Sequence, residues 1–99
     1  MNVNHVLAEK VMKWQTDKES GKWIVKGGLL TKTFWNPLYR IEDAWTVLET
    51  FHEGLVRKRM GGLNYRAWVI HEGKEYAEFG STACIAIVSV ALRAHGIKV

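Results

Sequence analysis

The segment from 54 to 80, GLVRKRMGGLNYRAWVIHEGKEYAEFG, decides the fold because its side chains alternate with a period of two. It divides into three runs: GLVRKRM (54–60), LNYRAWVIH (63–71) and KEYAEFG (74–80). Two glycine-containing breaks separate the runs, Gly61-Gly62 and Glu72-Gly73. Alternating runs joined by such two-residue breaks are typical of β-hairpins, so we predict a three-stranded antiparallel meander.

The alternation assigns every side chain of the meander to one of two faces. In the first run, Leu55, Arg57 and Arg59 alternate with Val56, Lys58 and Met60. In the second, Arg66, Trp68 and Ile70 alternate with Tyr65, Ala67 and Val69, and in the third, Ala77 and Phe79 alternate with Tyr76 and Glu78. Arg57 and Arg59 thus share one face of the first strand, and one arrangement of the strands puts Arg66 on the same face.

Helices are predicted before and after the meander along the chain. Apolar residues recur at steps of three and four from Val3 to Trp14, which indicates an amphipathic helix. A second helix is predicted from about Ile41, with Gly54 as its stop and with a buried face formed by Ala44, Trp45, Leu48 and Phe51. A third is predicted from Ser81, as N-cap, to His95. It is apolar on almost every side, so the fold or another subunit must enclose it.

Residues 15 to 37 have no helical period, and their Gly, Ser and charge clusters predict a loop with one short extended piece over 22–26. Pro37 forces the residue before it out of the α region. Four aromatic side chains surround this proline: Phe34, Trp35, Tyr39 and Trp45. They could line a cleft for a flat ligand. We favour the alternative, in which Trp35 and Trp45 pack over the sheet, because it also explains the helical spacing that follows.

These elements predict one α+β domain over residues 1–99, in the order helix, irregular segment with a short strand, helix, three strands, helix. A chain of 99 residues can bury a continuous core without disulfide or metal staples. The lone Cys84 lies in an apolar run and predicts a buried thiol in a reducing compartment. No signal peptide or membrane-spanning run is recognisable, so we expect a cytoplasmic protein without a membrane partner.

Catalytic motifs are absent from the sequence: it has no Walker loop, no GxGxxG, no GxSxG and no CxxC. His5 and Glu9 are spaced as ordinary neighbours on one helix face, and the other histidines are scattered along the chain. The acidic residues of the second helix indicate a solvated face, not a catalytic pair. We therefore expect no enzyme activity, no metal and no cofactor.

The basic meander is the best candidate for a binding site. Residues 54 to 74 contain five basic residues and one acidic residue, a surplus equal to the net charge of +4 of the whole chain. Arg57, Arg59 and Arg66, with Tyr65 or Trp68 beside them, could bind phosphates and stack bases. The alternative is a solvated sheet face whose arginine stems cover apolar surface. We favour that alternative, because dedicated nucleic-acid binders carry a larger surplus.

Four short motifs resemble the phage ABA-sandwich domain family: AEKVMKW (8–14), FWNP (34–37), DAWTV (43–47) and ACIA (83–86). The resemblance covers nearly the whole chain, although Leu38-Tyr39-Arg40 stands where such proteins tend to place a small polar helix cap. It implies a small phage or prophage protein, many relatives coming from Bacillus and related bacteria, that works in the host cytoplasm.

The resemblance implies no particular activity, so we expect an accessory protein that acts by binding. Its expected partners are a second copy, through the last helix or an edge strand, or a host or phage protein. Binding of nucleic acid or a nucleotide-like ligand, which could interfere with host signalling or defence, is the alternative.

Overall fold

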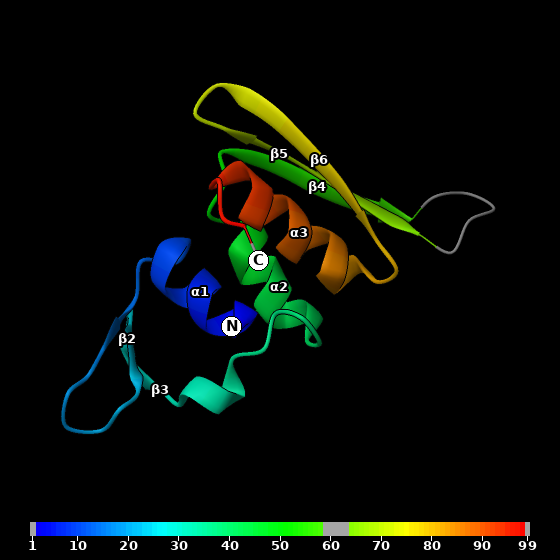
Figure 1. The fold of residues 1–99 in the computed structure, drawn as a ribbon. Helices are drawn as coiled ribbons and strands as arrows, with labels where there is room; N and C mark the ends of the chain where they lie inside the picture. The colour runs from blue at the N-terminus through cyan, green and yellow to red at the C-terminus, as the bar shows by residue number, and fades with distance from the viewer. Residues whose placement is uncertain (1, 59–63, 99) are drawn as a thin grey trace.

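The computed structural model of the protein describes residues 2–58 and 64–98, which form an α+β fold with three helices and two antiparallel sheets (Figure 1). The helices are α1 (Val3–Lys10), α2 (Ile41–Leu48) and α3 (Ala83–Ala94), with a 3-10 turn η1 (Lys32–Phe34). The small sheet contains β1 (Gln15–Thr16), β2 (Trp23–Val25) and β3 (Gly28–Leu30). The large sheet contains β4 (Glu53–Lys58), β5 (Tyr65–His71) and β6 (Lys74–Gly80).

The large sheet confirms the predicted antiparallel meander, in the order β4-β5-β6. The turn between β5 and β6 consists of Glu72 and Gly73, and both have positive φ (51° and 78°). This backbone is that of a two-residue type I′ hairpin turn, whose twist suits the flanking strands. The other predicted turn, Gly61-Gly62, lies outside the described residues. The prediction that Gly54 stops the second helix is wrong: α2 ends at Leu48 and Gly54 lies within β4.

All three helices lie on one side of the large sheet (Figure 1). α3 packs directly against that sheet, while α2 and α1 contact α3 from its other side. Eight of the side chains of α3 are buried, among them Ile87 and Val90 at 0% exposure. The fold of the chain itself therefore encloses the apolar helix. The sequence had left open whether the fold or another subunit would do so. Cys84 is buried in this helix, and burial raises the pKa of its thiol.

The helix boundaries differ from the predicted ones for local reasons. α1 ends at Lys10 and not at Trp14, because Lys13 adopts the left-handed region (φ 63°) and turns the chain toward β1. α3 is capped by the side chain of Thr82, which accepts a hydrogen bond from the backbone N–H of Ile85 at 3.1 Å. The predicted cap, Ser81, lies one residue too early. No helix of the described residues is long and apolar enough to span a membrane.

The predicted loop over 15–37 is partly a sheet. The extended piece around Trp23 and Val25 is confirmed as β2, but β1 and β3 pair with it on either side. Strands of two or three residues are too short to show an alternating pattern, which explains why the sequence did not reveal them. Trp23 is only 2% exposed, so this small sheet contributes to the core.

The aromatic segment around Pro37 is only partly buried. Trp35 is 4% exposed, but it packs edge-on against Trp14 at 4.8 Å between ring centroids. The preceding η1 lies across the helices from the large sheet (Figure 1). The prediction that Trp45 belongs to the core over that sheet is wrong, since Trp45 is 48% exposed. The buried side of α2 is formed by Ala44, Val47 and Leu48, and Trp45 points away from that side.

Candidate binding surface

The face of the large sheet that points away from α3, the outer face, is the candidate binding surface. In the described strands it carries nine side chains: Glu53, Leu55 and Arg57 of β4, Arg66, Trp68 and Ile70 of β5, and Glu75, Ala77 and Phe79 of β6. The inner face packs on the helices, and its central residues Ala67 and Val69 are 0% exposed. The pleat thus separates a buried face from an open one, as alternation along the strands predicted.

Strand register arranges the outer face in three rows across the sheet. The first row is Glu53, Ile70 and Glu75, with an acidic side chain at each edge. The middle row is Leu55, Trp68 and Ala77. The third row is Arg57, Arg66 and Phe79. Along the strands the surface therefore changes from acidic to apolar to basic.

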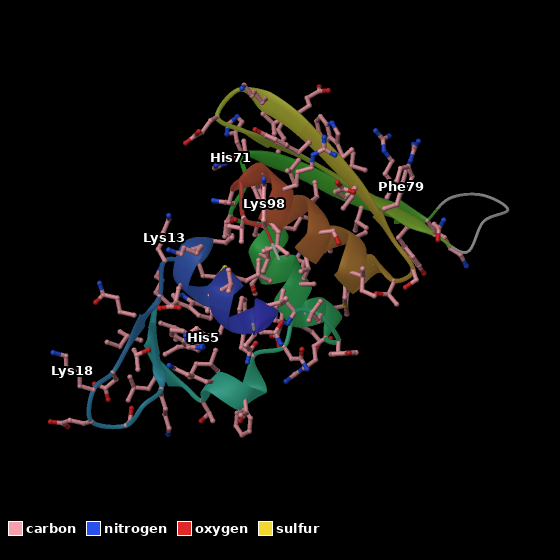
Figure 2. All side chains as sticks on the ribbon, viewed as in Figure 1. His5, Lys13, Lys18, His71, Phe79 and Lys98 are labelled. Atoms are coloured by element: carbon pink, nitrogen blue, oxygen red, sulfur yellow. The ribbon has the colours of Figure 1, made fainter. Side chains whose placement is uncertain are left out.

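The outer face is unusually apolar for a sheet face in water. Leu55 is 46% exposed, and Phe79, labelled in Figure 2, is 53% exposed. The register places the partly buried Trp68 directly beside Leu55 and diagonally from Phe79. Antiparallel sheets with one solvated face normally place polar residues there. Apolar side chains gathered on an exposed face mark a site of interaction with another molecule.

Arg57 and Arg66 lie directly opposite each other across β4 and β5. Like charges in this position repel and destabilise the sheet. Neither guanidinium forms an ion pair with an acidic side chain among the described residues. An anionic group from outside the described chain would relieve this repulsion.

The same two arginines, together with Leu55 and Trp68, line a shallow hollow of about 220 Å³. The structure thus brings Arg57, Arg66 and Trp68 to one surface, the placement that the binding hypothesis requires. Tyr65 lies on the inner face and packs against the core, because residues at odd positions of β5 point toward α3. The structure therefore does not place Tyr65 beside the arginines. Arg59 lies outside the described residues.

Sequence reasoning missed the apolar part of this surface. Alternation groups Leu55 with Arg57 on the first strand, but it does not indicate that Leu55 is exposed or that Phe79 lies on the same face. The sequence pattern also places Glu53 in the second helix, and its position at the acidic edge follows only from the earlier start of β4.

A second cleft, of about 280 Å³, is lined by residues of α1, the small sheet and η1, among them His5, which Figure 2 labels. The His5 ring lies tilted by 59° against Trp23, at 4.8 Å between ring centroids, and Lys32 Nζ lies over the same indole, 4.2 Å from its centroid. Trp23 is only 2% exposed, so its ring is already covered by the protein itself. His5 also forms the predicted pair with Glu9, at 3.0 Å. Across the described ranges 2–58 and 64–98, no three metal-ligating side chains gather at one point.

A cluster of three rings joins the end of α3 to β5. His71 and His95 lie 4.3 Å apart between ring centroids, and Phe51 lies 5.6 Å from each. Burial lowers the pKa of His95, and the nearby His71 and Lys13 lower it further. The cluster therefore favours a neutral imidazole at position 95, which suits a packing role.

Comparison with known proteins agrees with this fold. The sequence matches the phage ABA sandwich domain over residues 5–92. The structure is similar to the crystal structure of a phage protein from Bacillus cereus, with a TM-score of 0.74 and 25% sequence identity. That similarity covers 98% of this chain and 87% of the Bacillus cereus chain. No curated protein matches the sequence. Because the domain match covers most of its length, the chain belongs to the phage ABA sandwich domain family.

Proposed function

We propose that the protein is a small phage accessory protein that acts by binding another protein and not by catalysis. The observation that carries this proposal is the open outer face of the large sheet. Its middle row combines the exposed Leu55 with Trp68, and Phe79 adds a further half-exposed ring. Burial of apolar surface contributes roughly 25 cal/mol per Å², and Trp and Arg are frequent at the energetic centre of interfaces.

The shape of the outer face favours a protein over a small molecule. It is a sheet surface with three chemically different rows, and its hollow measures only about 220 Å³. Sites for small molecules are usually deeper, at roughly 300–1,000 Å³. A partner that covers all three rows would bury the apolar row and meet both charged rows.

The groups with displaced pKa values support binding rather than catalysis. The pKa of Asp17 is lowered by hydrogen bonds from Ser20 in an exposed loop. The pKa of the Cys84 thiol is raised and that of His95 is lowered, in both cases mainly by burial. Each of these shifts has a local structural cause, and the three groups lie in separate parts of the fold.

Affinity capture with matched variants tests the proposal. The tagged wild type is compared with the double variant Leu55→Ser/Phe79→Ser in lysate from phage-infected host cells. The control, Ile24→Ser/Leu29→Ser, removes equally exposed apolar side chains from the small sheet (46% and 52% exposed). We expect a partner that the wild type and the control retain and the outer-face variant loses, and that also binds when purified. Identical partners for all three proteins would contradict the proposal.

A nucleotide or nucleic acid is the second candidate ligand. It is favoured by one observation, the opposed pair of Arg57 and Arg66 beside the ring of Trp68. A thermal-shift screen with nucleotides and short oligonucleotides tests it, because a ligand at one hundred times its Kd stabilises a protein by about 2.7 kcal/mol. A stabilisation that Arg66→Ala abolishes and Lys18→Ala preserves would support this ligand. Lys18 lies on the β1–β2 loop, far from the outer face (Figure 2).

A further inference from the structure

We propose that the partner on the outer face is a second copy of the same chain, bound face to face in a two-fold symmetric dimer. This inference rests on the proposed function, since it names the molecule that covers the face. It follows from the order of the three rows. The two-fold axis lies in the plane of the interface and runs perpendicular to the strands. Rotation about it places the acidic row of one copy over the basic row of the other.

The order of charges is clearest on β4. Its outer face carries an acidic, an apolar and a basic side chain in succession, at Glu53, Leu55 and Arg57. Alternate residues of a strand lie about 6.6 Å apart, so these three side chains are evenly spaced. The two-fold rotation reverses the direction of β4. It places Arg57 over Glu53 of the second copy and Glu53 over Arg57 of the second copy. Such reciprocal contacts are the defining property of an isologous interface.

The central strand extends the same relationship. Arg66 comes to lie over Ile70 of the second copy, in the row whose two edges are Glu53 and Glu75. Arg57 therefore faces Glu53 directly, and Arg66 lies between the columns of Glu53 and Glu75, while Phe79 lies over Glu75. The nearby carboxylates offset the repulsion between the two arginines. The other possible two-fold axis, parallel to the strands, would place the basic rows on each other. Charge alone therefore selects one of the two arrangements.

The middle row supplies the apolar centre of the interface. Trp68 lies on the central strand in the central row, so the two-fold axis passes over it and the two indoles meet there. Leu55 and Ala77 flank it on the neighbouring strands. Two sheets packed in this way lie about 10 Å apart, with the side chains of both inner surfaces between them. A large aromatic residue at the centre, with two reciprocal Glu53–Arg57 pairs at the β4 edge, is typical of an energetic hot spot.

The sequence suggested self-association through the last helix, but α3 exposes less apolar surface than the outer face does. The apolar side chains of α3 are buried against the large sheet and the other helices. The outer face exposes its apolar side chains instead. Because it spans only three short strands, the interface belongs to the small class and the dimer should be weak.

Charge reversal provides the test. Glu53→Arg places an arginine over Arg57 of the second copy, and Arg57→Glu places a glutamate over Glu53 of the second copy. Each single variant should dissociate at least about tenfold more readily than the wild type, because like charges then face each other across the interface. A one-to-one mixture of the two variants should recover association. In the mixed dimer, the introduced arginine at position 53 of one copy lies over the introduced glutamate at position 57 of the other.

The measurement is the average mass by sedimentation equilibrium, from about 5 to 500 μM. The wild type should rise from the monomer mass of 11.3 kDa toward twice that value. Each single variant should stay nearer the monomer, and the mixture should return to the wild-type curve. Circular dichroism checks that the variants remain folded. A monomeric wild type, single variants that associate like the wild type, or a mixture that fails to recover would each overturn the dimer.

Sedimentation and affinity capture together distinguish a failure of the dimer from a failure of the proposed function. A monomer whose outer face still captures a different protein removes the dimer and leaves the binding function in place. A dimer that forms with the expected charge dependence, in lysates where the wild type captures no other protein, supports the dimer and counts against binding of another protein. If the arginines bind an anionic ligand instead, mixing the two variants does not restore association.

Discussion

Gly80, the last residue of β6, approaches the backbone of Ala86 in α3 so closely that a Cβ at position 80 would lie 2.4 Å from the Ala86 nitrogen. The same Cβ would lie 2.9 Å from the carbonyl carbon of Ile85. Only two residues separate β6 from α3, so the helix folds back directly over the end of the strand. The absence of a side chain at Gly80 allows this contact between sheet and helix.

We predict that Gly80→Ala lowers the free energy of unfolding by at least about 2 kcal/mol, since backbone atoms would have to move. Gly54→Ala is the comparison. There the closest contact, at 2.8 Å, is Leu48 Cδ1, the end of a flexible side chain. Urea unfolding should therefore show a smaller loss for Gly54→Ala. Equal losses would indicate that the close approach at Gly80 does not limit the packing of α3.

The cap of α3 gives a second prediction. Thr82→Ala removes the hydroxyl that accepts the Ile85 N–H, and should cost about 1 kcal/mol of unfolding free energy. Ser81→Ala, one residue earlier, should change stability by less than about 0.5 kcal/mol. Urea unfolding of both variants distinguishes the two hydroxyls. A larger loss for Ser81→Ala would show that the helix begins where the sequence alone suggested.

Glycine positions and helix caps illustrate how far the sequence predicts the fold. Long periodic elements are predictable: the three strands of the large sheet and the three helices all follow from their periods, with Ile41 as the correct start of α2. Local details depend on tertiary contacts. Glycine at position 54 is compatible with a helix end and also with a strand that passes close to Leu48. The neighbouring residues in the sequence do not distinguish the two structures. Trp45 has the right spacing for the core face of α2, but Val47 occupies that face instead.

The candidate surface was predictable only in part. Alternation grouped Arg66 with Trp68 on one strand and left open whether Arg57 of the neighbouring strand shares their face; the register shows that it does. The order of rows across the sheet depends on strand register, which the pattern of a single strand does not reveal. Register puts Arg57 opposite Arg66 and Leu55 opposite Trp68. The acidic and basic ends of the surface become visible only when the three strands are aligned.

A third prediction concerns pH. Because the pKa of His95 lies below its ordinary value of 6.5 in the folded protein, the unfolded chain binds more protons as the pH falls below 6.5. The contribution of His95 to stability is thus fully present above pH 6.5 and is lost as the pH falls through the lower folded pKa. His71 and Lys13 oppose the positive charge, while Glu72 favours it. Unfolding free energy should therefore decrease from pH 7 to pH 5.

His95→Gln should reduce this pH dependence, since the residue at position 95 then no longer titrates. His52→Gln is the control, because His52 is exposed and lies outside the ring cluster. Urea unfolding of the three proteins at pH 7, 6 and 5 measures the slopes. The pH dependence of stability does not come from His95 if His95→Gln keeps the slope of the wild type, or if His52→Gln removes the slope equally well.

The last prediction separates the two tryptophans of the aromatic segment. Trp35→Ala should cost about 3–5 kcal/mol, because it leaves a cavity beside Trp14 in the core. It also removes the hydrogen bond that Trp35 Nε1 donates to Thr46 Oγ1 at 3.3 Å. Trp45→Ala should cost much less, since nearly half of that side chain is already in water. Urea unfolding at low protein concentration gives both values. If Trp45→Ala proves as costly as Trp35→Ala, the ring at position 45 must be covered in solution, and α2 would then be a second surface of association.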